Sequence, residues 1–164
     1  MASGDTLLVF YPYNNEPPIS NYATLDTRNL HPILDFNEDT DEAAVFSAVL
    51  PRHYAGGGII AYIHWSADGV IVNDVVWDIA FERIGDGQQD VDIDGFAAVQ
   101  TVTDTAPGTD GFVTIANISF TDGAQIDSIA VGELFRLKIS RDADSQSDDM
   151  TADAELHAVE LKET

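Results

Sequence analysis

The chain has 164 residues, with 29 acidic residues against 7 basic ones and a net charge of −22. A surface this acidic repels phosphate backbones and anionic membranes, so we expect no nucleic-acid and no membrane partner. Hydrophobic residues make up 45% of the chain and no apolar run reaches the length of a membrane span, which predicts one folded domain with a real core. The lack of cysteine excludes disulfides, thiolate metal sites and a cysteine nucleophile.

The segments that read as strands alternate apolar and polar residues with period 2. In chain order they are 7–10, 33–36, 43–50, 58–65, 75–83, 96–102, 112–120, 134–140 and 154–161. The clearest is 75–83, where Val75, Trp77 and Ile79 share one face. Segment 112–120 is apolar on both phases, which is typical of a strand buried on both faces. A short helical turn is expected within 124–133, ahead of the strand at 134–140.

Turn residues separate these segments, such as the three glycines of 56–58, Gly85-Asp86-Gly87 and Asp122-Gly123. About eight strands separated by such turns predict an all-β fold. The favoured architecture is a jelly-roll-like antiparallel β-sandwich, with an immunoglobulin-like sandwich as the alternative. We expect residues 1–22 to form an extended N-terminal arm and residues 23–164 to form the single sandwich domain.

The arm contains YPYNNEPPISNY (11–22), with three prolines, three tyrosines and little alternation. Tyrosine and proline offer a large contact area at low entropic cost, because both side chains are nearly rigid. Two interpretations stay open: the arm packs along its own sheet, or it reaches a neighbouring subunit. Together with the loop 50–58, which carries Arg52 and His53, it is a candidate attachment surface.

The stretch GDGQQDVDIDGF (85–96) places Asp90, Asp92 and Asp94 on alternate positions before Gly95, as in the first half of a calcium loop. An EF-hand loop starting at Asp90 requires Glu at its twelfth position, where the chain has Thr101, so an EF-hand is excluded. A solvated turn is the favoured interpretation, and weak calcium binding at Asp90/Asp92/Asp94 stays open. No metal ligand and no cofactor is assigned.

A second acidic stretch follows Arg141, with Asp142, Asp144, Asp148 and Asp149 spaced like ligands. Gln146 and Ser147 stand where a calcium loop needs a carboxylate and a glycine, and Arg141 would neutralise part of the charge. We therefore expect an acidic loop between two strands. A metal shared by the two acidic stretches would require them to be adjacent in space.

Catalytic signatures are not found in the sequence. The histidines His31, His53, His64 and His157 are scattered, without H-x-H or H-E-x-x-H spacing, and no G-x-S-x-G, G-x-G-x-x-G or P-loop pattern occurs. We expect no catalytic residues and no enzyme; a cleft holding two carboxylates about 5–10 Å apart would reopen that question.

Glycan binding in β-sandwiches uses exposed aromatic faces, and four aromatic residues are candidates: Trp65, Trp77, Tyr54 and Tyr62. Trp77 alternates with the apolar set of 75–83, and Trp65 shares the phase of Ile59, Ala61 and Ile63. Aromatic residues on the inner phase of a strand usually belong to the core. Both tryptophans are therefore expected to be buried.

Five sequence segments carry a resemblance to a known group of proteins. In chain order they are YATLDTRNLHPILDF, AVFSAVLPRHYAGGGIIAYIHWSA, VVWDIAFERIGDGQQDVDIDGF, GELFRLKISRDADS and DAELHAVELKET. Over residues 20–164 they resemble small jelly-roll virion structural proteins of tailed phages and viral metagenomes. The resemblance implies a non-enzymatic, homo-oligomeric virion protein that is assembled in the host cytoplasm and partners the major capsid protein or other virion proteins. A capsid decoration (cement) subunit and a tail-associated component both fit. The alternative is a glycan-binding module, calcium-assisted or not, of a tail or fibre used in host attachment.

Overall fold

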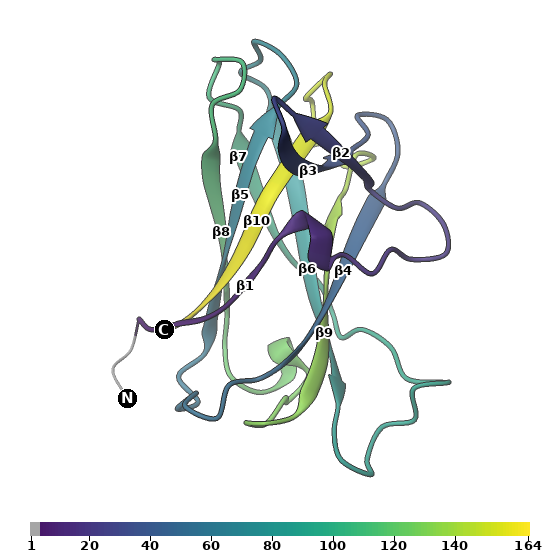
Figure 1. Ribbon diagram of the computed structural model, residues 1–164, viewed down its shortest axis with the longest axis vertical. Helices are drawn as coiled ribbons and strands as arrows, with labels where there is room; N and C mark the ends of the chain where they lie inside the picture. Colours follow the sequence, from purple (N-terminus) through teal and green to yellow (C-terminus); the bar gives the residue numbers. More distant parts are fainter. Residues whose placement is uncertain (1–3) are drawn as a thin grey trace.

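The computed structural model describes residues 4–164 and places their strands in two antiparallel sheets packed face to face (Figure 1). The strands are β1 (Thr6–Phe10), β2 (Thr24–Arg28), β3 (His31–Phe36), β4 (Glu42–Val49), β5 (Ile59–Ala67), β6 (Asp74–Ile84), β7 (Gln100–Thr105), β8 (Thr114–Phe120), β9 (Leu134–Arg141) and β10 (Ala154–Glu163). Two short 3₁₀ turns, η1 (Pro12–Asn14) and η2 (Ala124–Ile126), interrupt the loops. The larger sheet has the order β2-β3-β10-β5-β8, with β1 also paired to β10, and the smaller sheet has the order β4-β9-β6-β7.

This architecture confirms the predicted all-β antiparallel sandwich, with ten strands in the described chain instead of about eight. The helical turn expected within 124–133 is present as η2. The strand of the described chain that has no counterpart among the predicted segments is β2, whose sequence TLDTR shows no apolar alternation. It is exposed along nearly its whole length because it forms the edge of the larger sheet.

The core lies between the sheets and is built from the inward phases of both. Trp65 on β5 and Trp77 on β6 are fully buried, as the alternation predicted, and their rings meet edge to face with centroids 6.0 Å apart. Phe36 of β3 meets Trp77 in the same manner at 5.0 Å. Such pairs contribute about 0.5–1.5 kcal/mol each beyond the burial of their apolar area.

Two strand predictions were wrong in part. The segment 96–102 becomes a strand only from Gln100, because the preceding residues fold over the outer face of the smaller sheet. There the Phe96 ring lies 5.1 Å from the Arg136 guanidinium carbon and 5.0 Å from the Lys138 ammonium nitrogen. In segment 112–120, only alternate residues of β8 are buried, and Ile115 stays half exposed on the outer face.

The arm stays on its own domain in this structure. β1 pairs with β10, and residues 15–23 run beside the edge strand β4. The Glu16 N–H donates to the Val45 carbonyl at 2.7 Å, and the Val45 N–H donates to Oδ1 of Asn15 at 3.0 Å. Because an open strand edge invites pairing with another chain, this cover protects β4. Residues 1–3 of the expected arm lie outside the described residues.

The two acidic loops follow strands that run in opposite directions, so they lie at opposite ends of the sandwich. The loop 85–99 follows β6 at the lower end in Figure 1, and the loop 142–153 follows β9 at the upper end. A metal site shared between them, which the sequence left open, is therefore excluded. No helix in residues 4–164 is long and apolar enough to cross a membrane.

Candidate functional site

The aspartates of 85–96 form a hydrogen-bonded turn. Oδ1 of Asp90 accepts the N–H of Asp92 at 3.0 Å, and its carbonyl accepts the N–H groups of Ile93 and Asp94. This is the usual way in which an aspartate caps a turn. Across residues 4–164, no group of three or more His, Asp or Glu side chains is arranged to hold a metal ion.

The loop 142–153 uses its carboxylates to hold the fold together. Arg141 is fully buried and donates to both oxygens of Asp148, at 2.9 and 2.8 Å. It thereby neutralises part of the negative charge of this stretch, as predicted from the sequence. Asp148 also accepts the N–H of Val76, and Asp149 accepts the N–H of Asp74. These oxygens are occupied by protein donors, so Asp148 and Asp149 have a structural role.

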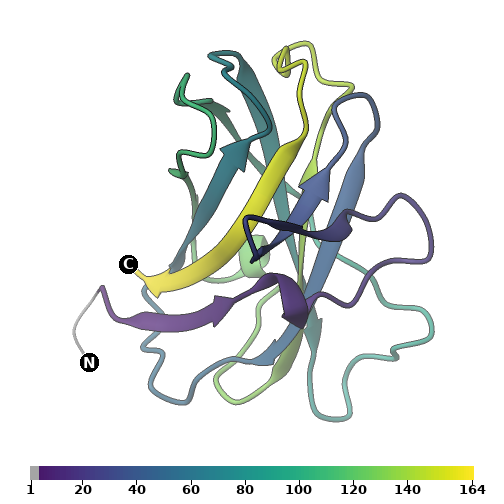
Figure 2. The same ribbon diagram turned by 45° about the horizontal axis from the view of Figure 1, so that its top comes forward.

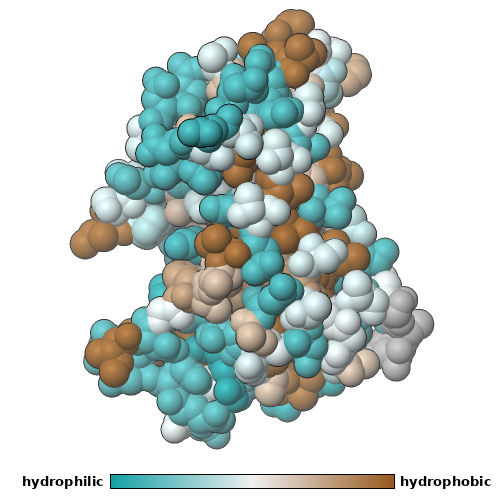
Figure 3. Space-filling view, turned by 180° about the vertical axis from the view of Figure 1, so that it is seen from behind, coloured by the Kyte–Doolittle hydropathy of each residue, from teal (hydrophilic) through white to brown (hydrophobic). Residues whose placement is uncertain are grey.

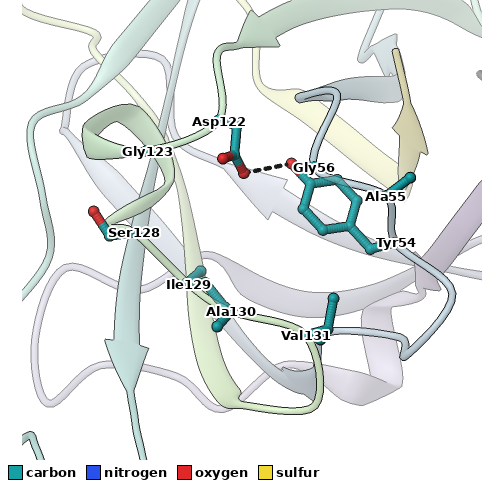
Figure 4. Close-up of a pocket in the computed structure, with 9 residues that line it drawn as sticks. All are labelled: Tyr54, Ala55, Gly56, Asp122, Gly123, Ser128, Ile129, Ala130 and Val131. Carbon is teal, nitrogen blue, oxygen red and sulfur yellow. Dashed lines mark hydrogen bonds between the residues drawn. The ribbon is translucent and has the colours of Figure 1, made fainter.

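A pocket of about 340 Å³ lies at the lower end, between the loops 54–56 and 122–131 (Figure 4). Tyr54 is only 6% exposed; its hydroxyl donates to Asp122 at 2.8 Å and accepts the N–H of Gly58 at 3.1 Å. Burial, with a smaller effect of the hydrogen bond to Asp122, raises the pKa of Tyr54 to about 12. Tyr54 therefore fastens the loop 50–58 and offers no free ring to a ligand.

A larger hollow, of about 390 Å³, lies between the β2–β3 turn and the loop 106–113, and we call it the hairpin cleft. Its lining is Arg28, Asn29, His31, Gly111, Val113 and His157. The turn has two residues, Asn29 and Leu30, with φ of 46° and 68°. Positive φ at both positions is what a tight hairpin requires; asparagine tolerates it and leucine rarely does. Figure 2 shows this hairpin in front of β10.

The guanidinium of Arg28 is fixed in the cleft wall by three acceptors. It donates to Glu155 at 2.5 Å, to the Ala67 carbonyl at 3.0 Å and to Asp110. The hydrogen bonds to Glu155 and then Asp110 raise the pKa of Arg28 above its ordinary value, so the group stays charged. Charge-assisted bonds of this kind hold an arginine in one orientation.

A buried polar network supports the floor of the cleft. The Ser66 hydroxyl donates to Glu155 at 2.8 Å and lies 2.8 Å from Nε2 of His157. Burial lowers the pKa of His157 below its ordinary value, so the ring is neutral near pH 7. Because Ser66 is fully buried and its proton points to Glu155, the three residues orient one another and do not form a nucleophile with its base.

A pair of carboxyl groups lies beside this network, because Asp35 on β3 is directly opposite Glu155 on β10. Burial, followed by the charges of Asp153 and Glu155, raises the pKa of Asp35 to about 7. One oxygen of Asp35 is buried without a hydrogen-bond partner in the described chain. Neither carboxyl group lines the cleft, so the pair does not reopen the enzyme question there.

Three of the four scattered histidines come together on the outer face of the larger sheet. His31, His64 and His157 lie on β3, β5 and β10, which are neighbours because β10 sits between the other two. After burial, which is the main cause, the proximity of His31 and His64 contributes to lowering the pKa of His157. His53 lies apart, in the loop 50–58. Spacing along the sequence carries no trace of this grouping; only the strand order reveals it.

The aromatic candidates for glycan contact are mostly internal. Trp65, Trp77 and Tyr54 are buried, and Tyr62 is partly buried on β5. The exposed aromatic rings are instead Tyr11, Tyr13 and Tyr22 of the arm and Phe112 beside the cleft. The sequence did point to the arm as a contact surface, through its tyrosines and prolines.

No known sequence family and no curated protein matches the chain. Among solved structures, the chain is similar to the carbohydrate-binding module CBM36 in complex with calcium and xylotriose, with a TM-score of 0.53 and 13% identity over 95% of this chain and 100% of that one. It is also similar to a family 35 carbohydrate-binding module from an environmental isolate, with a TM-score of 0.51 and 11% identity over 95% and 93%. The CBM22-2 xylan-binding domain from Paenibacillus barcinonensis Xyn10C gives a TM-score of 0.51 and 13% identity over 92% of both chains.

Because the sequence identities are this low, the similarity shows only that this chain and these structures share a fold. The resemblance to virion proteins of tailed phages gains no support specific to phages from these comparisons and stays a prediction. The chain has the jelly-roll β-sandwich fold that carbohydrate-binding modules also have.

Proposed function

We propose that the chain is a carbohydrate-binding module that holds a glycan in the hairpin cleft. The observation that carries this proposal is the fixed guanidinium of Arg28, which shares the cleft lining with Asn29, His31 and His157. Sugar hydroxyls both donate and accept hydrogen bonds, and planar polar side chains held in place bind them without first being ordered. Val113 adds an apolar wall for the C–H groups of a sugar ring.

The polar groups of the cleft complement one another. Asp110, half exposed beside Arg28, accepts a hydrogen bond from its guanidinium and holds it in place, whereas the amide of Asn29 in the cleft lining both donates and accepts. The neutral ring of His157 adds a further partner through Nδ1, since Nε2 faces Ser66. The buried bonds of Glu155 beneath the cleft keep this set rigid.

The test is calorimetric titration with neutral and acidic oligosaccharides. Xylo-oligosaccharides come first, because the structures of similar fold include one with xylotriose and one xylan-binding domain. Each titration is run with calcium and with a chelator, because the CBM36 structure contains calcium. A wild-type chain that binds no member of the panel under either condition refutes the proposal.

The variant that isolates the cleft is Asn29→Gly with His31→Ala. Glycine accepts the positive φ of position 29, and His31 is exposed, so the fold is kept. Loss of two hydrogen-bonding side chains is expected to weaken binding by about tenfold or more. The matched control is His53→Ala in the loop 50–58, which should bind as the wild type does.

A structural role in a virus particle, with the major capsid protein as partner, is the second candidate. Ile93 is 83% exposed and Val91 is 66% exposed at the tip of the loop 85–99. This loop projects at the lower left in Figure 3, with hydrophobic atoms at its tip. Exposed apolar side chains on a projection suit contact with another subunit. If sedimentation detects an oligomer that Ile93→Ser dissociates, this role is favoured.

A further inference from the structure

A second hollow, of about 280 Å³, lies where the arm meets β2, and we call it the tyrosine groove. Its lining includes Tyr13, Asn15, Pro17, Tyr22, Thr24 and Leu25. We infer that the tyrosine groove is a second glycan subsite, which stacks a neutral sugar ring on its tyrosines. This inference rests on the proposed glycan-binding function and adds a site that is separate from the hairpin cleft.

The two tyrosines are free to meet a ligand. Tyr13 is 71% exposed and Tyr22 is 50% exposed, and neither hydroxyl makes a hydrogen bond to another residue of 4–164. Tyr54, by contrast, is buried and has its hydroxyl bonded on both sides. Half-exposed tyrosines with an apolar ring and a free polar tip are typical of contact surfaces.

The uncharged lining of the groove favours a neutral ligand. No residue of its lining is charged at neutral pH, although the chain carries a net charge of −22. Glu16, the acidic residue of the segment 11–22, accepts a hydrogen bond from the Ser47 hydroxyl at 2.8 Å. A basic peptide would be drawn to carboxylates, and the groove offers none. A neutral ring with apolar C–H faces and hydroxyl edges fits tyrosine faces together with the side chains of Asn15 and Thr24.

The groove is held rigid before any ligand arrives. Asn15 fixes the arm through its Oδ1, which accepts the Val45 N–H, and its amide nitrogen is left to donate. At the other end of the segment, the Ala23 N–H donates to the Ala43 carbonyl at 3.0 Å. The prolines of 12–18 restrict the backbone between these anchors. A site ordered in advance loses little conformational entropy on binding.

The groove and the cleft lie at the two ends of one strand. β2 begins at Thr24 in the groove and ends at Arg28 in the cleft. At the usual rise of a strand, these residues are about 13 Å apart. Two subsites this close are within reach of a single extended polysaccharide chain, which gains avidity from touching both.

The test is a titration of the ¹⁵N-labelled chain with xylohexaose, cellohexaose and a linear galactan hexamer, followed by NMR. We expect two groups of shifted amides, one around residues 28–31 and 111–113 and the other around residues 13–25. Tyr13→Ala with Tyr22→Ala should weaken the response of the second group by about threefold to tenfold. The first group should still shift, but at a higher hexamer concentration, because the avidity from the groove is lost. The matched control is Tyr11→Ala, whose ring is exposed but lies outside the groove lining.

The outcomes separate the two proposals. Shifts confined to the cleft overturn the groove subsite and leave glycan binding in place. Shifts confined to residues 13–25 that the double variant abolishes support the groove and refute the cleft. If no hexamer shifts any amide, both fail together. Unfolding midpoints of the variants that match the wild type show that the fold is intact in each comparison.

Discussion

We expect mutations of the buried ion pair between Arg141 and Asp148 to lower the stability of the protein more than other mutations near the loop 142–153. The Arg141 side chain is 0% exposed and that of Asp148 is 2% exposed. Besides Asp148, the guanidinium donates hydrogen bonds to the carbonyl oxygens of Met150 and Ala152, at 2.7 and 2.8 Å. Replacing Arg141 by Leu therefore leaves the Asp148 carboxylate and two carbonyl oxygens buried without the guanidinium that donates hydrogen bonds to them.

The size of the effect follows from these burials. Removing one partner of a buried ion pair costs about 3–5 kcal/mol, because the other charge stays in the interior without compensation. A domain of this size has a total stability of about 5–15 kcal/mol, so the variant loses a large share of it. At about 2–4 °C per kcal/mol, the melting temperature should fall by roughly 6–20 °C.

Urea unfolding followed by tryptophan fluorescence measures this loss, because both indoles are in the core. The control is Arg52→Leu, an exposed arginine without an ion pair in the described chain, which should change stability by less than about 0.5 kcal/mol. Changing Arg141 and Asp148 to Leu together should cost less than the sum of the single changes. A loss below about 1 kcal/mol for Arg141→Leu would show that water or rearrangement compensates the charge, and would refute the argument.

Three further predictions concern other positions. Since the folded chain holds the proton of Asp35 up to a pKa of about 7 and an unfolded aspartate releases it near 3.9, stability from this group falls as the pH rises from about 4 to 7; Asp35→Asn should flatten the pH dependence of the urea midpoint. Gly58→Ala should destabilise by about 1–3 kcal/mol in the same assay, because φ is +105° and the new Cβ would lie 2.7 Å from the Phe120 carbonyl oxygen. Changing the three aspartates of 90–94 to Asn should leave a calorimetric calcium titration unaltered; a site lost in that variant would contradict the turn structure.

The alternation of apolar residues predicted most of the sandwich, because burial between two sheets enforces period 2. It failed where burial was not the cause of the structure. β2 is held by pairing with β3 at a sheet edge, so it needs no apolar face. At 96–99 an apolar stretch covers the outer face of a sheet through Phe96, which alternation cannot distinguish from the start of a strand.

The hairpin cleft could not be predicted from the sequence, since its residues come from distant segments. Arg28 and His157 belong to β2 and β10, which are separated by β3 in the sheet order and by most of the chain in sequence. Pairing between such segments depends on topology, for which one sequence gives no local signal. The tyrosine groove was partly predictable, because its rings lie close together in one proline-rich segment. Its contact with β2 and its anchoring to β4 required the structure.

The acidity of the chain gives a last prediction, on salt. Four of the five arginines lie in ion pairs, at Arg28, Arg83, Arg136 and Arg141, so almost all the remaining carboxylates repel one another. Salt screens exposed charges over about 10 Å at 0.1 M and about 3 Å at 1 M, whereas a buried pair is screened much less. The unfolding midpoint of the wild type should therefore rise with sodium chloride, and the stability difference between wild type and Arg141→Leu should stay constant. A difference that shrinks with salt would mean that the Arg141 pair is reached by solvent.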